Sequence, residues 1–190
     1  MVDASFKAIV VGTSAGGFVA LSTIFSKLRR NFPLPIIVVQ HLDPSNQSIL
    51  ACLLAERTEM EVREAFDKEL IQPGVIYTAP ANYHLLVEVD YHFALSIDKF
   101  VCYSRPSIDV LFESASLAYG ASLVGILLTG ANTDGTEGFK TIKQNGGFTL
   151  AQDPSTAEAA LMPRFAIQNT DVDIVLPLDE IGDFINKLCY

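Results

Sequence analysis

The chain has 190 residues, of which 49% are hydrophobic and 18% charged, and its formal net charge is −9 at pH 7. This length suffices for one buried core and is short for two, so residues 1–190 are expected to form a single domain. The acidic balance argues against nucleic-acid binding, which needs a basic surface. No apolar stretch approaches the roughly 20 residues of a membrane span, and no apolar leader precedes the first predicted strand. We therefore expect a cytoplasmic protein without membrane insertion.

The cysteines give no sign of a metal site. Cys52, Cys102 and Cys189 are odd in number, far apart and in no C-x-x-C pair. This spacing indicates neither a disulfide framework nor a zinc site. We predict no metal and no organic cofactor.

Short apolar runs alternate with segments of helical periodicity, which is typical of a parallel sheet covered by helices. The predicted opening is a strand, a helix, a strand and a helix, at residues 7–12, 16–29, 35–40 and 47–56.

Three short β-type runs follow, at 74–79, 84–89 and 93–97, separated by turn residues. They predict a small antiparallel excursion around residues 74–97. Alternation then resumes with helices at 107–118 and 136–145, near 163–167 and at 179–188, and with strands at 122–129, 148–151 and 174–177. The expected fold class is α/β, a doubly wound and mostly parallel sheet with helices on both faces.

A G-x-S-x-G motif, Gly12-Thr13-Ser14-Ala15-Gly16, lies between the first predicted strand and helix. This is the context of a nucleophile elbow, in which small neighbours allow a sharp turn that exposes the serine hydroxyl. The alternative role of Ser14 is an N-cap in a tight turn. A nucleotide-binding loop agrees less well with this segment, because the segment has neither the G-x-G-x-x-G spacing nor a glycine-lysine pair.

A serine nucleophile needs a base, and histidine is the usual one near neutral pH. His41 directly follows the strand predicted at 35–40, whereas His84 and His92 lie in turns. Catalytic groups of open α/β sheets gather beyond the carboxyl ends of the strands, so position favours His41. Its alternative role is a loop histidine that caps the next helix.

A catalytic histidine also needs a carboxylate that fixes its tautomer. Asp134 follows the strand predicted at 122–129, so it is expected at the same sheet edge as Ser14 and His41. The alternative role of Asp134 is an N-cap of the helix predicted at 136–145. Asp43 competes for the partner role, but it is only two positions from His41 and would need an awkward turn.

Three candidate triad members therefore end three separate strands at one sheet edge. Their chain order is serine, histidine, aspartate, which differs from the order in α/β-hydrolases. A serine hydrolase of another family is indicated.

The residues resemble the catalytic domain of the CheB family of chemotaxis receptor methylesterases. The resemblance extends over nearly the whole chain in ordered blocks, which are 10–17, 40–42, 76–80 with 84–86, 105–112, 128–130 with 134–135, and 162–164. It implies a doubly wound α/β domain that hydrolyses glutamate γ-methyl esters on receptor signalling helices and, in some members, deamidates glutamine. The family's catalytic serine, histidine and aspartate fall on Ser14, His41 and Asp134.

The chain departs from the family pattern in three places. Thr129-Gly130 is followed by Ala131-Asn132 where the family commonly has Met-Gly, and Ala15 stands where threonine is frequent. The chain also starts at the first strand of the esterase domain. This predicts an excised domain, or a stand-alone form without the receiver domain that gates other members by phosphorylation.

The expected reaction is attack of Ser14 on the ester with His41 as base, and the expected partner is a methylated chemotaxis receptor. A receptor methyltransferase is a second candidate partner. Receptor methylation regions are generally acidic, so Arg105 and Arg164 are candidates for a basic rim, with surface or structural roles as the alternative. The other functions that the residues leave open are a catalytically silent signalling module and a general small-ester hydrolase.

Overall fold

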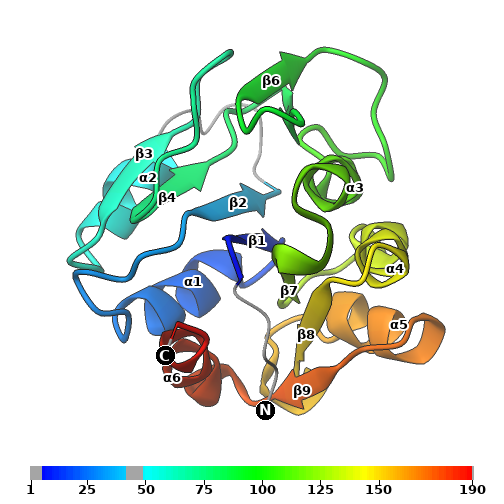
Figure 1. Ribbon diagram of the computed structural model, residues 1–190. Coiled ribbons are helices and arrows are strands. Elements are labelled where there is room, and N and C mark those ends of the chain that lie inside the picture. Colours follow the sequence, from blue (N-terminus) through cyan, green and yellow to red (C-terminus); the bar gives the residue numbers. More distant parts are fainter. Residues whose placement is uncertain (1–5, 42–48, 190) are drawn as a thin grey trace.

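A parallel sheet of seven strands forms the centre of the protein, in the order β3-β4-β2-β1-β7-β8-β9 (Figure 1). The computed structural model describes residues 6–41 and 49–189. The sheet strands are β1 (Ala8–Thr13), β2 (Ile36–Gln40), β3 (Glu61–Glu64), β4 (Val75–Thr78), β7 (Leu123–Leu127), β8 (Phe148–Gln152) and β9 (Ile174–Leu176). Strands β1, β2, β4 and β7 are buried throughout, as expected for parallel strands covered on both faces.

Helices cover both faces of the sheet (Figure 1). The α-helices are α1 (Gly17–Phe25), α2 (Ile49–Ala55), α3 (Ile108–Tyr119), α4 (Thr136–Gln144), α5 (Leu161–Asn169) and α6 (Leu178–Lys187), and two short 3-10 helices span Gly120–Ser122 and Pro154–Thr156. Alternate residues of β1 belong to two hydrophobic cores, one on each face of the sheet. Ile9 and Val11 pack toward α1, α2 and α6, whereas Ala8 and Val10 pack toward α3, α4 and α5. This alternation confirms the doubly wound fold class.

A two-stranded antiparallel sheet, β5 (His84–Val87) with β6 (Phe93–Ser96), lies beside α3. The predicted excursion is thus confirmed for these two runs. The run 74–79 differs, because β4 pairs in parallel with β2 and β3 inside the main sheet. Its residues are all buried, which suits a central parallel strand. The sequence analysis missed β3, a charged edge strand of four residues.

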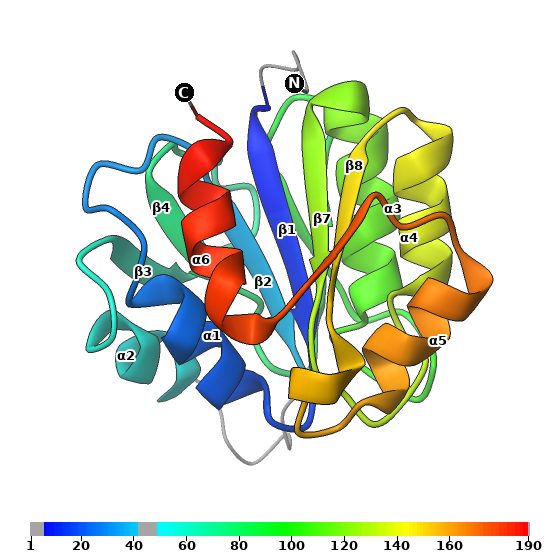
Figure 2. The same cartoon turned by 90° about the horizontal axis from the view of Figure 1, so that it is seen from below.

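The order of the strands reverses beside β1. From β1 the chain adds β2 beside it, then β3 at the edge of the sheet and β4 between β3 and β2, and it returns to place β7 on the other side of β1. Figure 2 shows the carboxyl ends of these strands at the lower edge of the sheet. In open α/β sheets, ligands bind beyond the carboxyl ends of the strands at such a switch point. The loops that follow β1 and β7 meet there, together with His41 at the end of β2.

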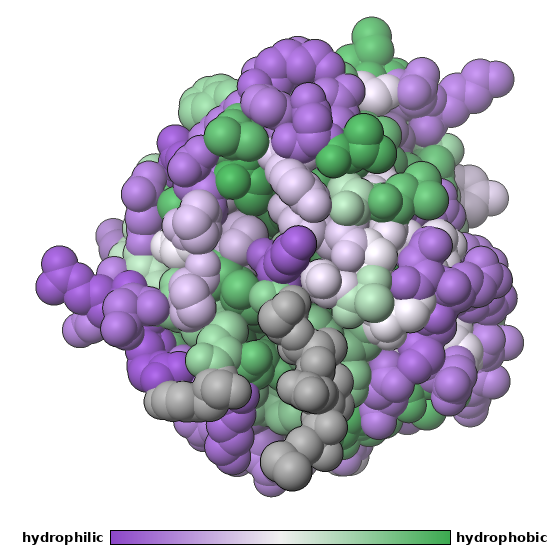
Figure 3. All heavy atoms as spheres, in the orientation of Figure 1, coloured by the Kyte–Doolittle hydropathy of each residue, from purple (hydrophilic) through white to green (hydrophobic). Residues whose placement is uncertain are grey.

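Hydrophilic residues dominate the periphery of the face shown in Figure 3, and hydrophobic residues are exposed between them in small groups. Within the described residues, no helix has both the length and the apolar character to cross a bilayer.

The aromatic stack between α3 and α4 predicts a large stability effect. Phe112 is fully buried, and its ring lies 5.6 Å from the ring of Phe139. Phe112→Ala is expected to lower the free energy of unfolding by about 3–5 kcal/mol, because it removes a buried ring and leaves a cavity. Leu117→Ala, at an exposed position of the same helix, should change it by less than about 0.5 kcal/mol. Urea unfolding followed by circular dichroism measures both, and equal losses would contradict this account.

Candidate functional site

The loop after β1 is joined to the loop after β7 by hydrogen bonds. The backbone N–H of Ser14 and the hydroxyl of Thr13 both donate to the carbonyl oxygen of Thr129, each at 2.9 Å. Gly16 ends this turn with a φ of 78°, which is a left-handed conformation that favours glycine. The turn therefore holds Ser14, a partly exposed residue, at the start of α1.

The end of β2 is fixed against the same turn. The side-chain amide of Gln40 donates to the carbonyl oxygen of Ser14 at 2.7 Å, and the backbone N–H of His41 donates to that of Thr13 at 3.0 Å. Gly17 allows this approach, because a Cβ at that position would collide with the Gln40 side chain. Ser14 and His41 therefore begin from adjacent, rigid strand ends.

His41 and Asp134 are in direct contact. Nε2 of His41 lies 2.8 Å from Oδ2 of Asp134. The side chain of Asp134 is fully buried, and that of His41 is 11% exposed. Since a carboxylate only accepts hydrogen bonds, this contact places the proton of the neutral ring on Nε2 and leaves a lone pair on Nδ1.

The Asp134 carboxylate lies at the N-terminus of α3 and is hydrogen-bonded to it. It accepts hydrogen bonds from the Ser107 hydroxyl at 2.9 Å and from the backbone N–H groups of Ile108 and Asp109 at 2.7 and 3.0 Å. Burial by itself would raise the pKa of Asp134, but the hydrogen bonds from His41 and the α3 backbone outweigh it and lower the pKa. Asp134 is therefore a buried anion with its charge compensated.

A second buried carboxyl, Asp109, lies behind Asp134. Its Oδ1 accepts from the backbone N–H groups of Gly135 and Gly138 at 2.9 and 2.8 Å. Burial, and then repulsion by the neighbouring Asp134, raise the pKa of Asp109 to about 7. The pKa values of these two neighbouring carboxyls are thus shifted in opposite directions.

Cys102 completes a set of possible metal ligands with these two carboxyls. One ligand atom from each of Cys102, Asp109 and Asp134 lies within 4.8 Å of the others. Burial, with Asp134 and Asp109 adding to it, raises the pKa of the Cys102 thiol to about 11. The Asp134 oxygens and Oδ1 of Asp109 already accept protein N–H and O–H groups, so a metal would have to displace these donors.

Asn132 contacts the other side of the His41 ring. Its Nδ2 lies 3.4 Å from Nδ1 of His41, and its Oδ1 accepts from the backbone N–H of Asp134 at 3.2 Å. The side-chain amide therefore bridges the histidine and the aspartate.

The structure brings His41 and Asp134 into contact and places Ser14 at the adjacent strand end. Among the described residues there is no hydrogen bond between the Ser14 hydroxyl and the His41 ring. Asp43, the competing acid, lies outside the described residues, as do residues 47–48 at the start of the helix predicted at 47–56. His92 lies elsewhere, with its Nδ1 3.2 Å from Asp90.

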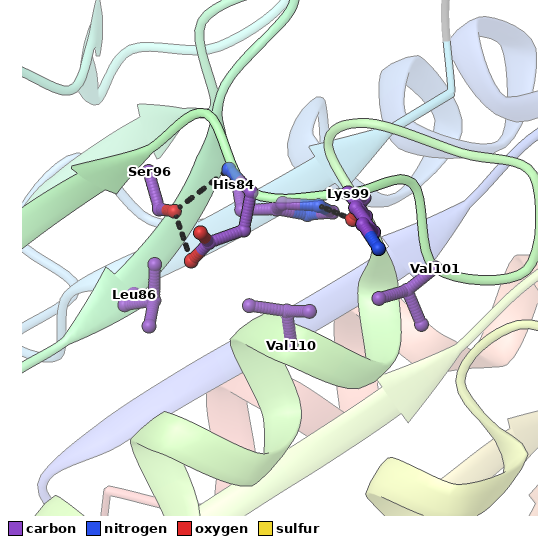
Figure 4. A pocket seen from close by; sticks show the side chains of 7 residues that line it. His84, Leu86, Ser96, Lys99, Val101 and Val110 are labelled. Carbon is purple, nitrogen blue, oxygen red and sulfur yellow. Dashed lines mark hydrogen bonds between the residues drawn. The ribbon is translucent and has the colours of Figure 1, made fainter.

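His84 lines a separate hollow of about 210 Å³ between the β5–β6 hairpin and α3 (Figure 4). Its Nε2 bonds the carbonyl oxygen of Lys99 at 3.0 Å, and its Nδ1 accepts from the backbone N–H of Ser107 at 3.2 Å. Because Ser107 also donates to Asp134, His84 supports the aspartate indirectly and is not in position to serve Ser14.

Sequence reasoning missed the roles of Ser107, Asp109 and Asn132 in this network. A usable signal existed for the first two, because a serine where a predicted helix begins and an aspartate in its first turn are typical of a helix N-terminus. No pattern indicated that Asn132 would reach the histidine, since that contact depends on the conformation of the loop.

The switch point of this doubly wound sheet carries a histidine–aspartate pair beside a serine turn. These features define an α/β domain of the class whose chemistry takes place at the carboxyl edge of a parallel sheet. The family model for the CheB methylesterase domain matches residues 9–185, so the chain belongs to the CheB methylesterase family.

Similar proteins cover almost the whole chain. A Leptospira interrogans protein is 48% identical over 97% of this chain and 95% of its own length. The protein-glutamate methylesterase/protein-glutamine glutaminase of Clostridium acetobutylicum is 35% identical over 97% of this chain, which spans 53% of that protein. The crystal structure of the Thermotoga maritima CheB methylesterase catalytic domain has a TM-score of 0.93 and 35% identity, and the match covers 97% of this chain and 99% of that one.

The raised pKa of Asp109 predicts a specific dependence of stability on pH. Between the ordinary aspartate pKa of 3.8 and the folded value of about 7, the folded state binds the proton more tightly than the unfolded state. The contribution of Asp109 to stability is thus present at low pH and lost as pH rises through that window, by at most about 1.4 kcal/mol per pH unit.

Asp109→Asn should remove this loss, because an amide oxygen can still accept from Gly135 and Gly138 without carrying a charge. Urea unfolding at pH 5 and pH 8 measures the effect, with Asp183→Asn on the surface of α6 as control. An equal drop in stability between the two pH values in wild type and Asp109→Asn would contradict the assignment.

Proposed function

We propose that the chain is a serine hydrolase that removes methyl groups from glutamate γ-methyl esters of chemotaxis receptors, with Ser14 as nucleophile, His41 as base and Asp134 as the group that orients the base. The observation that carries this proposal is the 2.8 Å contact between His41 and the buried Asp134, next to the Ser14 turn. Family membership and the names of the related proteins support the substrate class. We also propose a single catalytic domain that acts in the cytoplasm.

The proposed chemistry follows from where the ring proton lies. With the proton of Nε2 directed at Asp134, the Nδ1 lone pair of His41 accepts the Ser14 proton as the serine oxygen attacks the ester carbonyl. The proton then passes to the leaving oxygen, and methanol departs. Water, deprotonated by the same nitrogen, hydrolyses the glutamyl-serine ester and returns the free carboxyl and the free serine. Asp134 stabilises the imidazolium in both steps.

Two backbone N–H groups are suited to stabilise the oxyanion. Within the described residues, the N–H groups of Ala15 and Ala131 have no hydrogen-bond acceptor, whereas that of Gly130 donates to Ala159 at 2.9 Å. Ala15 follows Ser14 in the loop after β1, and Ala131 lies in the loop after β7, which is hydrogen-bonded to the Ser14 turn through Thr129. Free backbone donors near a nucleophile are what a transient oxyanion requires.

The amide bond of glutamine can enter the same sequence of steps with ammonia as the leaving group. The name of the Clostridium acetobutylicum relative includes glutaminase, and we extend the proposal to receptor glutamine on that basis. Arg164, exposed on the first turns of α5, is the proposed basic contact for the acidic receptor. Arg105 instead donates to the carbonyl oxygens of Ile97 and Asp98, at 2.8 and 3.1 Å, which supports a structural role.

Methanol release from a methylated receptor fragment tests the proposal. Wild type should release methanol, and Ser14→Ala should lose at least about 1,000-fold in rate, because no other group can form the acyl intermediate. Ser26→Ala, at the end of α1, is the matched control and should retain full activity.

Absence of methanol release by folded wild type would favour the signalling module without catalysis. Hydrolysis of simple chromogenic esters at a rate equal to or above that of the receptor ester would favour the general esterase.

Asp134→Asn tests the orienting role. The amide would no longer hold the ring proton on Nε2, so Nδ1 would lose its lone pair in much of the population, and kcat should fall by about 10,000-fold while KM changes little. The kinetic constants of Asp134→Asn and of the control Asp183→Asn measure this. Full activity of Asp134→Asn would exclude the proposed role.

A further inference from the structure

The Nδ1 lone pair of His41 faces the side-chain amide of Asn132 in this structure. The distance from Nδ2 of Asn132 to Nδ1 of His41 is 3.4 Å. This nitrogen is the one that the proposed mechanism needs for the Ser14 proton, because Nε2 is directed at Asp134. The contact therefore involves the reactive atom of the proposed base.

The orientation of the Asn132 amide is fixed by its other end. Its Oδ1 accepts the backbone N–H of Asp134 at 3.2 Å, so the NH₂ group must lie on the side of the histidine. The opposite orientation would place NH₂ against a backbone N–H. Asn132 is thus a donor to His41, and its position is set by the residue that binds the far side of the ring.

An imidazole nitrogen has one lone pair in the ring plane and accepts one strong hydrogen bond at a time. Asn132 and Ser14 must therefore compete for Nδ1 of His41. We propose that Asn132 is a positioning residue that restrains the base: its amide holds the His41 lone pair in the resting protein, and the Ser14 hydroxyl must displace it to become activated.

This inference rests on the proposed function of Ser14 and His41 and adds a control on the same site. The restraint is formed by two residues of the chain itself, Asn132 in the loop after β7 and His41 at the end of β2. A neutral N–H···N contact of this length is weak, so its removal should accelerate the attack of Ser14 by about 2- to 10-fold.

Nitrogen NMR tests whether the hydrogen bond exists. The chain has three histidines, so ¹⁵N-histidine labelling gives few ring signals, and His41→Gln assigns those of His41. At a pH where the ring is neutral, Asn132→Ala should move the His41 Nδ1 signal to higher frequency, because the nitrogen loses its donor. Thr133→Ala, in the same loop, should leave the signal unchanged.

The rate at which Ser14 reacts with a fluorophosphonate probe tests the restraint. Asn132→Ala should react about 2- to 10-fold faster than wild type and Thr133→Ala at the wild-type rate, measured above the pH at which the ring protonates. Slower or unchanged labelling of Asn132→Ala, or an Nδ1 signal that does not move, would overturn the inference.

The receptor assay separates this inference from the proposed function. Faster labelling of Asn132→Ala together with no methanol release would overturn the receptor substrate and leave the restraint standing. Equal labelling of all variants together with normal methanol release would overturn the restraint and leave the function standing.

Discussion

A buried negative charge is the constraint on which this site depends. A carboxylate removed from water is costly unless donors surround it, and Asp134 meets this requirement with the first N–H groups of α3, the Ser107 hydroxyl and the His41 ring. The start of α3 must therefore lie beyond the end of β7, and β2 must end beside it. Neutralising the Asp134 carboxylate thus constrains where the loop after β7, the end of β2 and the start of α3 can lie.

The same environment gives two neighbouring carboxyls opposite properties. The pKa of Asp134 is lowered although burial opposes ionisation, because five donor groups, including its own loop, face it. The pKa of Asp109 is raised, because burial and the charge of Asp134 act on it and only two backbone N–H groups compensate. The available donors favour one charge at this depth, and a second charge is disfavoured.

Much of this arrangement could be predicted from sequence, for identifiable reasons. Alternating apolar and helical segments predicted the parallel sheet, and the position of Ser14, His41 and Asp134 after strands predicted their shared edge. The pattern could not predict β3, whose charged residues look like a loop, or the place of β4, because strand pairing depends on contacts distant in sequence. The Asn132 contact depends on loop dihedrals that no periodicity encodes, and the roles of all three predicted residues remain proposals.

The reversal of strand order beside β1 divides the site between the two parts of the chain. Ser14 and His41 belong to the segment before residue 97, whereas Asp134 and the helix that neutralises it belong to the segment after residue 106. The connecting stretch includes exposed residues such as Phe100 and Tyr103. A chain divided there would place the proposed nucleophile and its base on one fragment and the orienting acid on the other. The site is thus suited to fragment complementation, in which pairing of β1 with β7 brings Ser14, His41 and Asp134 back together in one step.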